Sequence, residues 1–244
     1  MSGHNNTINE CSFSSDGRLL ATASDDNTMR LWDVDSHQCI VMMNKHTDCV
    51  NSCKFSPDDT LVASASRDCT VRLWNVKSHR CIATLCDHRH FVTSVTFSAD
   101  GAVLASASND MTVQLIDMKT NSYETLAVLA HDNGVNGCDI SRNGILASTS
   151  DDIIVRLWDI NTQKCITGFF GHRDQCNKCC FTADGTLLAS TSGDNTVRLW
   201  DMRTRHSIAT LKDSKSETWN VHSPVMVHGL QLLVMMTVLH EYGM

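Results

Sequence analysis

The sequence lacks the long apolar runs and the amino-terminal signal that mark membrane and secreted proteins. Its longest mostly apolar stretch, Val225–Leu239, contains His228 and Gln231. It is shorter than the roughly 18–20 residues that a membrane-spanning helix needs. Residues 1–6 carry neither a charged leader nor an apolar core, so we expect no secretory signal. These absences predict an intracellular chain with no membrane partner.

Positive charge, proline and disorder-promoting composition are also scarce. The 20 Lys and Arg residues are outnumbered by 27 Asp and Glu residues, which gives a formal net charge of −7 at pH 7. This balance argues against binding to nucleic acid or anionic lipid through their phosphates. With 42% hydrophobic residues and only 2 prolines, the chain is not predicted to be disordered. Its 244 residues suffice for a sizeable core.

What the sequence does contain is an internal repeat of 42 residues. The repeat is marked by a tryptophan or isoleucine near its end, at Trp32, Trp74, Ile116, Trp158 and Trp200. A period of 42 divides the 244 residues into about 5.8 units, and periods of about 40–45 residues are typical of stacked arrays such as propellers.

Each unit has the alternation of short strands rather than helices. In the second unit, Val50–Phe55 alternates, residues 56–59 signal a turn, and Leu61–Ser66 predicts a short buried strand. Thr70–Trp74 and His79–Leu85 predict two further strands. The unit is therefore expected to form one four-stranded antiparallel sheet.

Two motifs recur in register with this repeat. The first ends in histidine, at Gly3-His4, Lys45-His46, Asp87-His88, Ala130-His131 and Gly171-His172. The second follows Phe-Ser-x-Asp-Gly, at Phe13–Gly17, Phe55–Asp59, Phe97–Gly101, Ile140–Gly144 and Phe181–Gly185. Together they resemble the WD-repeat (WD40) family. The resemblance implies an all-β β-propeller of four-stranded antiparallel blades over residues 1–211, with repeats at about 4–43, 46–85, 88–129, 131–170 and 172–211.

The pattern degrades after Leu211. Tyr242 lies 42 residues beyond Trp200, but no turn aspartate precedes it. We expect residues 212–244 to form a degenerate, incomplete sixth blade or an irregular tail. Three interpretations stay open: a fragment or splice form, a six-bladed ring with an incomplete last blade, and an open array. We favour an incomplete last blade in a truncated gene product.

Every repeat also carries a histidine, a hydroxyl, an aspartate and usually a tryptophan. The sets are His4, Thr22, Asp26, Trp32; His46, Ser64, Asp68, Trp74; His88, Ser106, Asp110; His131, Ser148, Asp152, Trp158; and His172, Ser190, Asp194, Trp200. Catalysis needs one activated nucleophile, so a set in every repeat predicts structure rather than hydrolysis. The resemblance implies a hydrogen-bond chain from Asp to Trp. Repeat three, with Ile116, is predicted to be weakest, so that Asp68→Ala costs more stability than Asp110→Ala.

The cysteines are interpreted as small buried hydrophobes of a reducing compartment. One slot holds Cys11, Cys53, Cys138 and Cys179, with Val95 in repeat three. A second slot is assigned to Cys39, Cys81 and Cys165, with Tyr123 and Ser207 in the remaining repeats. Cys176 and Cys179 form a CxxC pair with no second pair, and residues three apart in a strand should face opposite sides. No metal site and no cofactor are predicted.

A partner is expected at the rim that holds the turns between second and third strands and the connections between repeats. By register, the candidate residues are Thr7, Asn9, Asp25, Cys49, Asn51, Arg67, Phe91, Thr93, Asn109, Gly134, Asn136, Asp151, Gln175, Asn177 and Gly193. Asparagine stands five residues after the histidine in four of the five repeats, with Thr93 as the exception, and these amides either bind a ligand or hydrogen-bond neighbouring backbone groups. Phe91 either anchors a partner or packs on its own loop.

These features predict a non-catalytic scaffold that binds a protein or peptide within a larger cytoplasmic complex, with the nucleus as the alternative location. The resemblance extends to substrate receptors of ubiquitin ligases and to apoptosome-type sensors. An enzyme would have to use Asp25, Arg67 and Asp151, which have no nucleophile or metal set beside them. An RNA- or chromatin-associated propeller conflicts with the acidic total. No small-molecule ligand is expected.

Overall fold

The computed structural model describes residues 3–212, which divide into two compact units between Ala130 and His131. The described residues contain strands and turns without a helix. The predicted incomplete sixth blade lies outside them, except for Lys212, which ends the last strand. Each unit is described by itself below.

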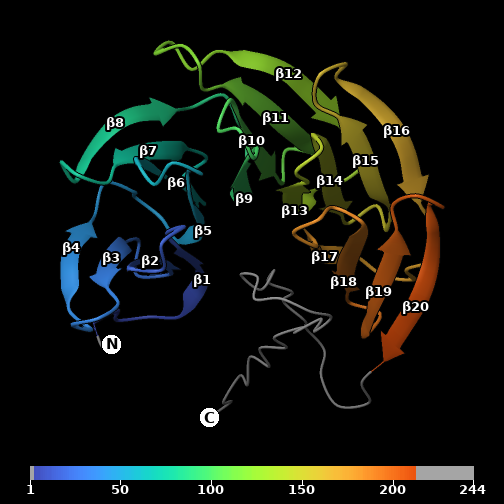
Figure 1. The fold of residues 1–244 in the computed structure, drawn as a ribbon, viewed down its shortest axis with the longest axis horizontal. Coiled ribbons are helices and arrows are strands. Elements are labelled where there is room, and N and C mark those ends of the chain that lie inside the picture. Colours follow the sequence, from blue (N-terminus) through green and yellow to red (C-terminus); the bar gives the residue numbers. More distant parts are fainter. Residues whose placement is uncertain (1–2, 213–244) are drawn as a thin grey trace. The chain divides into compact units, whose positions relative to one another are not determined.

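The first unit contains three four-stranded antiparallel sheets, each built from consecutive strands (Figure 1). The first sheet has β1 (Ile8–Phe13), β2 (Leu19–Ser24), β3 (Met29–Asp33) and β4 (Cys39–Met43). The second has β5 (Val50–Phe55), β6 (Leu61–Ser66), β7 (Val71–Asn75) and β8 (Arg80–Leu85). The third has β9 (Val92–Phe97), β10 (Val103–Ser108), β11 (Thr112–Asp117) and β12 (Thr125–Ala130).

The second unit contains two sheets of the same kind, drawn from green to red in Figure 1. One has β13 (Val135–Ile140), β14 (Ile145–Ser150), β15 (Val155–Asp159) and β16 (Lys164–Phe169). The other has β17 (Cys176–Phe181), β18 (Leu187–Ser192), β19 (Thr196–Asp201) and β20 (His206–Lys212). The predicted four-stranded unit is thus confirmed in all five repeats.

Strand composition follows position in the sheet. The second strand of each repeat is buried on both faces, and small residues suit it because neighbouring sheets pack against it. In β6, Ala63, Ser64, Ala65 and Ser66 are all fully buried. The fourth strand lies at the outer edge, and β8 accordingly alternates between exposed and half-buried side chains.

The core lies between consecutive sheets within each unit. Small side chains of one sheet, such as Ala21 and Ala23, pack with larger ones of the next, such as Phe55 and Trp74. The second unit repeats this packing with Ala147 in one sheet and Trp200 in the other. Because each face is covered by the neighbouring repeat, a single repeat could not bury its own core.

A β-bulge interrupts the first strand of each repeat, and strict alternation was therefore a wrong prediction. The pairing of β5 with β6 skips Asn51, and both Ser52 and Cys53 are fully buried. In β17 the register shifts between Cys176 and Cys179. The two cysteines do not lie on opposite faces as predicted: both are buried in one hydrophobic cluster, since the bulge adds a residue between them.

The second cysteine slot was also assigned wrongly. Ile116 pairs with Thr125, where Trp74 pairs with Cys81, because the turn between β11 and β12 is longer. Tyr123 instead occupies a turn position with positive φ, like His79. Cysteines of this slot are not buried hydrophobes: Cys39 and Cys165 are exposed, and Cys81 is half-buried. In the first slot Cys53, Cys138 and Cys179 are buried, while Cys11 is exposed.

Candidate functional site

The recurring polar set forms a buried hydrogen-bond chain. In repeat two, Nδ1 of His46 donates to Oδ2 of Asp68 at 2.8 Å, and Nε2 of His46 lies 2.7 Å from Oγ of Ser64. Nε1 of Trp74 donates to the same hydroxyl at 2.8 Å. The corresponding contacts recur in repeats one, four and five. The chain joins the turn before the third strand to the centre of the sheet.

The electrostatics of the chain favour an ionised aspartate. Burial alone would raise the pKa of Asp68, but hydrogen bonds from His46 and Thr70 outweigh it and hold the pKa well below its usual value. Ser64 is fully buried, so its hydroxyl has no access to a substrate. This burial supports the structural interpretation over a hydrolase.

Repeat three shortens the chain by one member. His88 keeps its contacts to Asp110 at 2.8 Å and to Ser106 at 2.7 Å. Ile116 fills the tryptophan position and is 2% exposed. Ser106 therefore receives no indole hydrogen bond, as the sequence suggested.

Repeat four has a further member that the sequence reasoning missed. The guanidinium of Arg156 contacts the carboxylate of Asp152 and forms an ion pair with Asp132 at 2.8 Å. Burial would lower the pKa of Arg156, but the hydrogen bond and charge of Asp152 raise it. The signal was present in the sequence, since an arginine stands two residues before the tryptophan in repeats one, two, four and five.

The predicted rim residues come together in pairs. The backbone N–H of Arg67 donates to the carbonyl of Cys49 at 2.9 Å, and that of Asn109 to the carbonyl of Phe91 at 3.0 Å. The remaining repeats pair Asp25 with Thr7, Asp151 with Gly134, and Gly193 with Gln175 in the same way. Each turn before a third strand is thus fastened to the segment that enters the first strand.

The rim asparagines occupy the bulges and bind the next repeat. Nδ2 of Asn9 donates to Oδ1 of Asp25 at 2.7 Å and to the carbonyl of Val50 at 3.0 Å. Nδ2 of Asn51 donates to the carbonyl of Val92 at 2.8 Å.

In the second unit, Asn136 likewise donates to Asp151 at 2.6 Å and to the carbonyl of Cys176 at 3.0 Å. The sequence left open whether these asparagines bind a ligand or hydrogen-bond neighbouring backbone groups, and these contacts favour the second interpretation. Asn177 stands at the corresponding position of β17.

The rim of repeat three differs from the others. Thr93 replaces the asparagine, and its hydroxyl donates to the carbonyl of Ala107 in its own sheet. Oδ1 of Asn109 is buried and has no hydrogen-bond partner among the described residues. Phe91 is 37% exposed, and its ring lies 4.4 Å from that of His90, tilted by 60°. An exposed aromatic ring and an unused acceptor therefore belong to two residues that are hydrogen-bonded to each other.

Metal sites and membrane-spanning helices were also sought in the part of the chain that the structure describes. Residues 3–212 contain no cluster of three or more His, Cys, Asp or Glu side chains able to hold a metal ion. Within the same range, no helix is long and apolar enough to cross a membrane.

The five sheets coincide with matches to a known family, the WD40 repeats (WD domain, G-beta repeat). The matched residues are 1–33, 37–75, 79–117, 123–159 and 163–201. The chain belongs to the WD40 repeat family. This confirms the predicted all-β fold and the family resemblance. WD40 repeats generally serve as protein-interaction scaffolds, and the family is typically non-catalytic.

Individual WD40 relatives match over about one repeat. WD repeat-containing protein 18 of Homo sapiens is 53% identical over 38 residues, which is 16% of this chain and 9% of that protein. The Danio rerio protein of the same name is 48% identical over 42 residues, 17% of this chain and 10% of the relative. The Bos taurus protein is 50% identical over 38 residues, with 16% and 9% covered. The matched part thus spans about a tenth of these curated relatives.

Proposed function

We propose that this chain is a non-catalytic interaction module that binds a protein partner at the rim of its third repeat. Phe91 and Asn109 are its central contact residues. The observation that carries the proposal is the contrast between repeats. Asp25 of repeat one accepts a hydrogen bond from the bulge asparagine, while Oδ1 of Asn109 accepts none among the described residues. Repeat three therefore lacks the internal side-chain hydrogen bond that repeat one makes at this position, and it adds the exposed ring of Phe91.

The rim of repeat three presents an apolar ring beside a polar amide, and a protein segment with both apolar and polar groups could contact both. Phe91 offers apolar surface, and an apolar side chain that covers it would gain about 25 cal/mol per Å² buried. Asn109 is half-buried and hydrogen-bonded to Phe91, so its side-chain amide adds a polar group to this part of the rim. Aromatic residues of this kind often dominate the energy of an interface.

The surrounding charges are mixed and predict no strongly charged partner. Arg67 is exposed on the rim of repeat two, and Asp25 is half-buried on that of repeat one. The excess of Asp and Glu over Lys and Arg in the whole chain argues against a nucleic-acid partner. We place the module in a larger cytoplasmic complex, with the nucleus as the alternative.

Affinity capture from cytosol tests the proposal. The native chain is compared with a variant that carries Phe91→Ala and Arg67→Glu, and with Val128→Ala as the control. Val128 belongs to the same repeat and is 57% exposed, but it lies on the outer strand β12. The rim variant is expected to lose specific partners that Val128→Ala retains. Partners unchanged by the rim variant would disprove the assignment.

The identity of the captured partner would also separate the finer alternatives. A ubiquitin-ligase assembly would place the module among substrate receptors, and a caspase-activating assembly among apoptosome-type sensors. Retention on heparin that falls with salt would instead favour RNA or chromatin association.

A further inference from the structure

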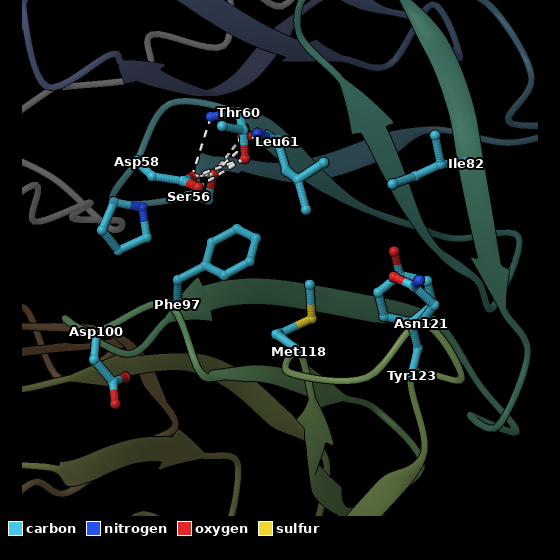
Figure 2. A pocket seen from close by; sticks show the side chains of 12 residues that line it. Ser56, Asp58, Thr60, Leu61, Ile82, Phe97, Asp100, Met118, Asn121 and Tyr123 are labelled. Carbon is cyan, nitrogen blue, oxygen red and sulfur yellow. Dashed lines mark hydrogen bonds between the residues drawn. The ribbon is translucent and has the colours of Figure 1, made fainter.

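A second surface of the first unit lies at the opposite ends of the strands from the rim. Repeats two and three enclose a cavity of about 520 Å³ there (Figure 2). Its walls come from the turn between β5 and β6, the strand β8, the end of β9 and the long turn between β11 and β12. We call this cavity the repeat 2–3 groove. Its volume falls within the range of sites that bind ligands.

A bridge that joins repeats one and two is missing between the two repeats that line the groove. The carboxylate of Asp59 accepts hydrogen bonds from the backbone N–H of Ser15 at 2.9 and 3.0 Å and also contacts its hydroxyl. The corresponding residues between repeats two and three are Pro57 and Gly101. Proline has no N–H to donate, and glycine has no side chain to reach across. A Cβ added to Gly101 would lie 3.6 Å from Cδ of Pro57.

The middle of the groove is apolar. Leu61 and Phe97 face each other from the two repeats, and Met118 lies beside Phe97 (Figure 2). Ile82 closes the far end and is 45% exposed. Tyr123 joins the lining because the turn between β11 and β12 carries extra residues, so that this wall is specific to repeat three.

Two aspartates, Asp58 and Asp100, belong to the lining and stand on its opposite walls (Figure 2). The lining contains no Lys, Arg or His, and neither carboxylate forms an ion pair within residues 3–212. Hydrogen bonds from Ser98 and the backbone of Ala102 keep the pKa of Asp100 below its usual value, with a smaller contribution from the charge of Lys119. Hydrogen bonds from Ser56 and Thr60 likewise lower the pKa of Asp58. Both carboxylates are therefore ionised at neutral pH.

We propose that the repeat 2–3 groove binds an extended segment of a protein partner that carries a Lys or Arg side chain near an apolar one. The basic group lies at Asp58 and Asp100, and the apolar side chain lies between Leu61 and Phe97. Charge complementarity selects this occupant, because an acidic lining that contains no basic residue favours a basic ligand. The groove is separate from the rim around Phe91, so one chain can hold two partner segments at once.

Selection from a random peptide library tests this proposal. The library is displayed on phage and selected on the immobilised full-length chain, and enriched peptides are resynthesised with a fluorescent label. We expect them to combine a basic and an apolar residue. Their dissociation constants, measured by fluorescence anisotropy, should rise about tenfold or more in the double variant Asp58→Asn/Asp100→Asn and in Ile82→Lys.

Matched controls come from the other repeats. Asp16→Asn/Asp184→Asn changes the same turn position, where each aspartate also accepts bonds from a hydroxyl and a backbone N–H. Ile40→Lys matches Ile82→Lys, since Ile40 holds the same place in β4 and is 41% exposed. The controls should leave peptide affinity unchanged. The Asp→Asn changes retain an acceptor oxygen, and thermal melting will show that the variants remain folded.

Three outcomes would overturn the proposal. They are enrichment of no peptide, enrichment of peptides without a basic residue, and affinities that the groove variants leave unchanged. If peptide binding is lost only in Phe91→Ala, the groove proposal is overturned and the rim proposal is supported. Peptides lost only in the groove variants would leave the rim proposal to its own test.

Discussion

The side-chain amide of Asn9 donates a hydrogen bond to the carbonyl oxygen of Val50, 41 residues further along the chain, at 3.0 Å. Asn51 makes the same bond to Val92. Both asparagines occupy β-bulges, which turn a side chain out of the regular pleat. The bulge thus converts a position inside a strand into a link between consecutive sheets.

This link predicts a measurable loss of stability in Asn51→Ala. The change leaves the carbonyl of Val92 without its amide donor, at an expected cost of about 1–2 kcal/mol in the free energy of unfolding. Urea unfolding measures it. Asn121→Ala is the control, because Asn121 is an exposed turn residue. Equal losses in the two variants would refute the link.

The shortened chain of repeat three makes a second prediction. Ser64→Ala removes the partner of Nε2 of His46 and of the indole N–H of Trp74, whereas Ser106→Ala removes only the partner of Nε2 of His88. Ser64→Ala should cost roughly 1–3 kcal/mol more, the penalty of one additional buried donor. Differential scanning calorimetry of the two variants checks the order, and equal melting temperatures would contradict it.

The two serine variants differ in the number of hydrogen bonds lost, whereas Asp68→Ala and Asp110→Ala do not. The expected larger cost of Asp68→Ala stays a prediction. Each of the two carboxylates accepts a histidine, a threonine hydroxyl and two backbone N–H groups. Their local contacts are therefore alike. A difference between these variants must arise through the rest of the chain, at Ile116.

Acid should destabilise the fold in two stages. Burial lowers the pKa of His131 and of His172 below the usual 6.5, although their aspartates oppose the shift. The unfolded chain then binds more protons than the folded chain as pH falls below about 6.5, so stability decreases there. The lowered pKa of Asp194 adds a second loss, which begins below the usual value of 3.8.

Urea midpoints measured from about pH 7.5 to about pH 3 test this order. In His131→Gln/His172→Gln the decline between about pH 7.5 and 5.5 should shrink, while the decline below about pH 4 remains. An unchanged first decline would show that these two histidines do not produce it.

Thiol reactivity should follow burial rather than repeat position. Burial raises the pKa of Cys176 to about 12 and that of Cys53 and Cys179 well above 9. These thiols should resist iodoacetamide in the folded chain, while the exposed Cys39 and Cys165 react. Mass spectrometry of alkylated peptides reads the difference. Rapid alkylation of Cys53 before that of Cys39 would contradict it, and alkylation in urea serves as the control.

The sequence was sufficient to predict the sheets, because their strands repeat with a fixed period, and its resemblance to WD repeats implied the polar chain. The expected strands Val50–Phe55 and Leu61–Ser66 match β5 and β6 without change. Spacing places the histidine and aspartate at the same end of each sheet, and the resemblance to WD repeats implied the hydrogen bond between Asp68 and His46.

The features that were missed depend on departures from regular geometry. Alternation cannot reveal a bulge, and so it placed Cys176 and Cys179 on opposite faces. A fixed period also hides a lengthened turn, which moved Tyr123 out of the slot first assigned to it. The groove beside Gly101 lies where one pair of repeats lacks a bridge that the preceding pair has.

The central claim is that partner binding resides at Phe91 while the repeated polar chains only hold the sheets. It is tested most directly by measuring, in one calorimetric experiment, the affinity of a captured partner for the native chain and for Phe91→Ala. The account predicts a dissociation constant about tenfold or more higher for Phe91→Ala, equivalent to about 1.4 kcal/mol, with no change in melting temperature. An unchanged dissociation constant in a folded variant would contradict it.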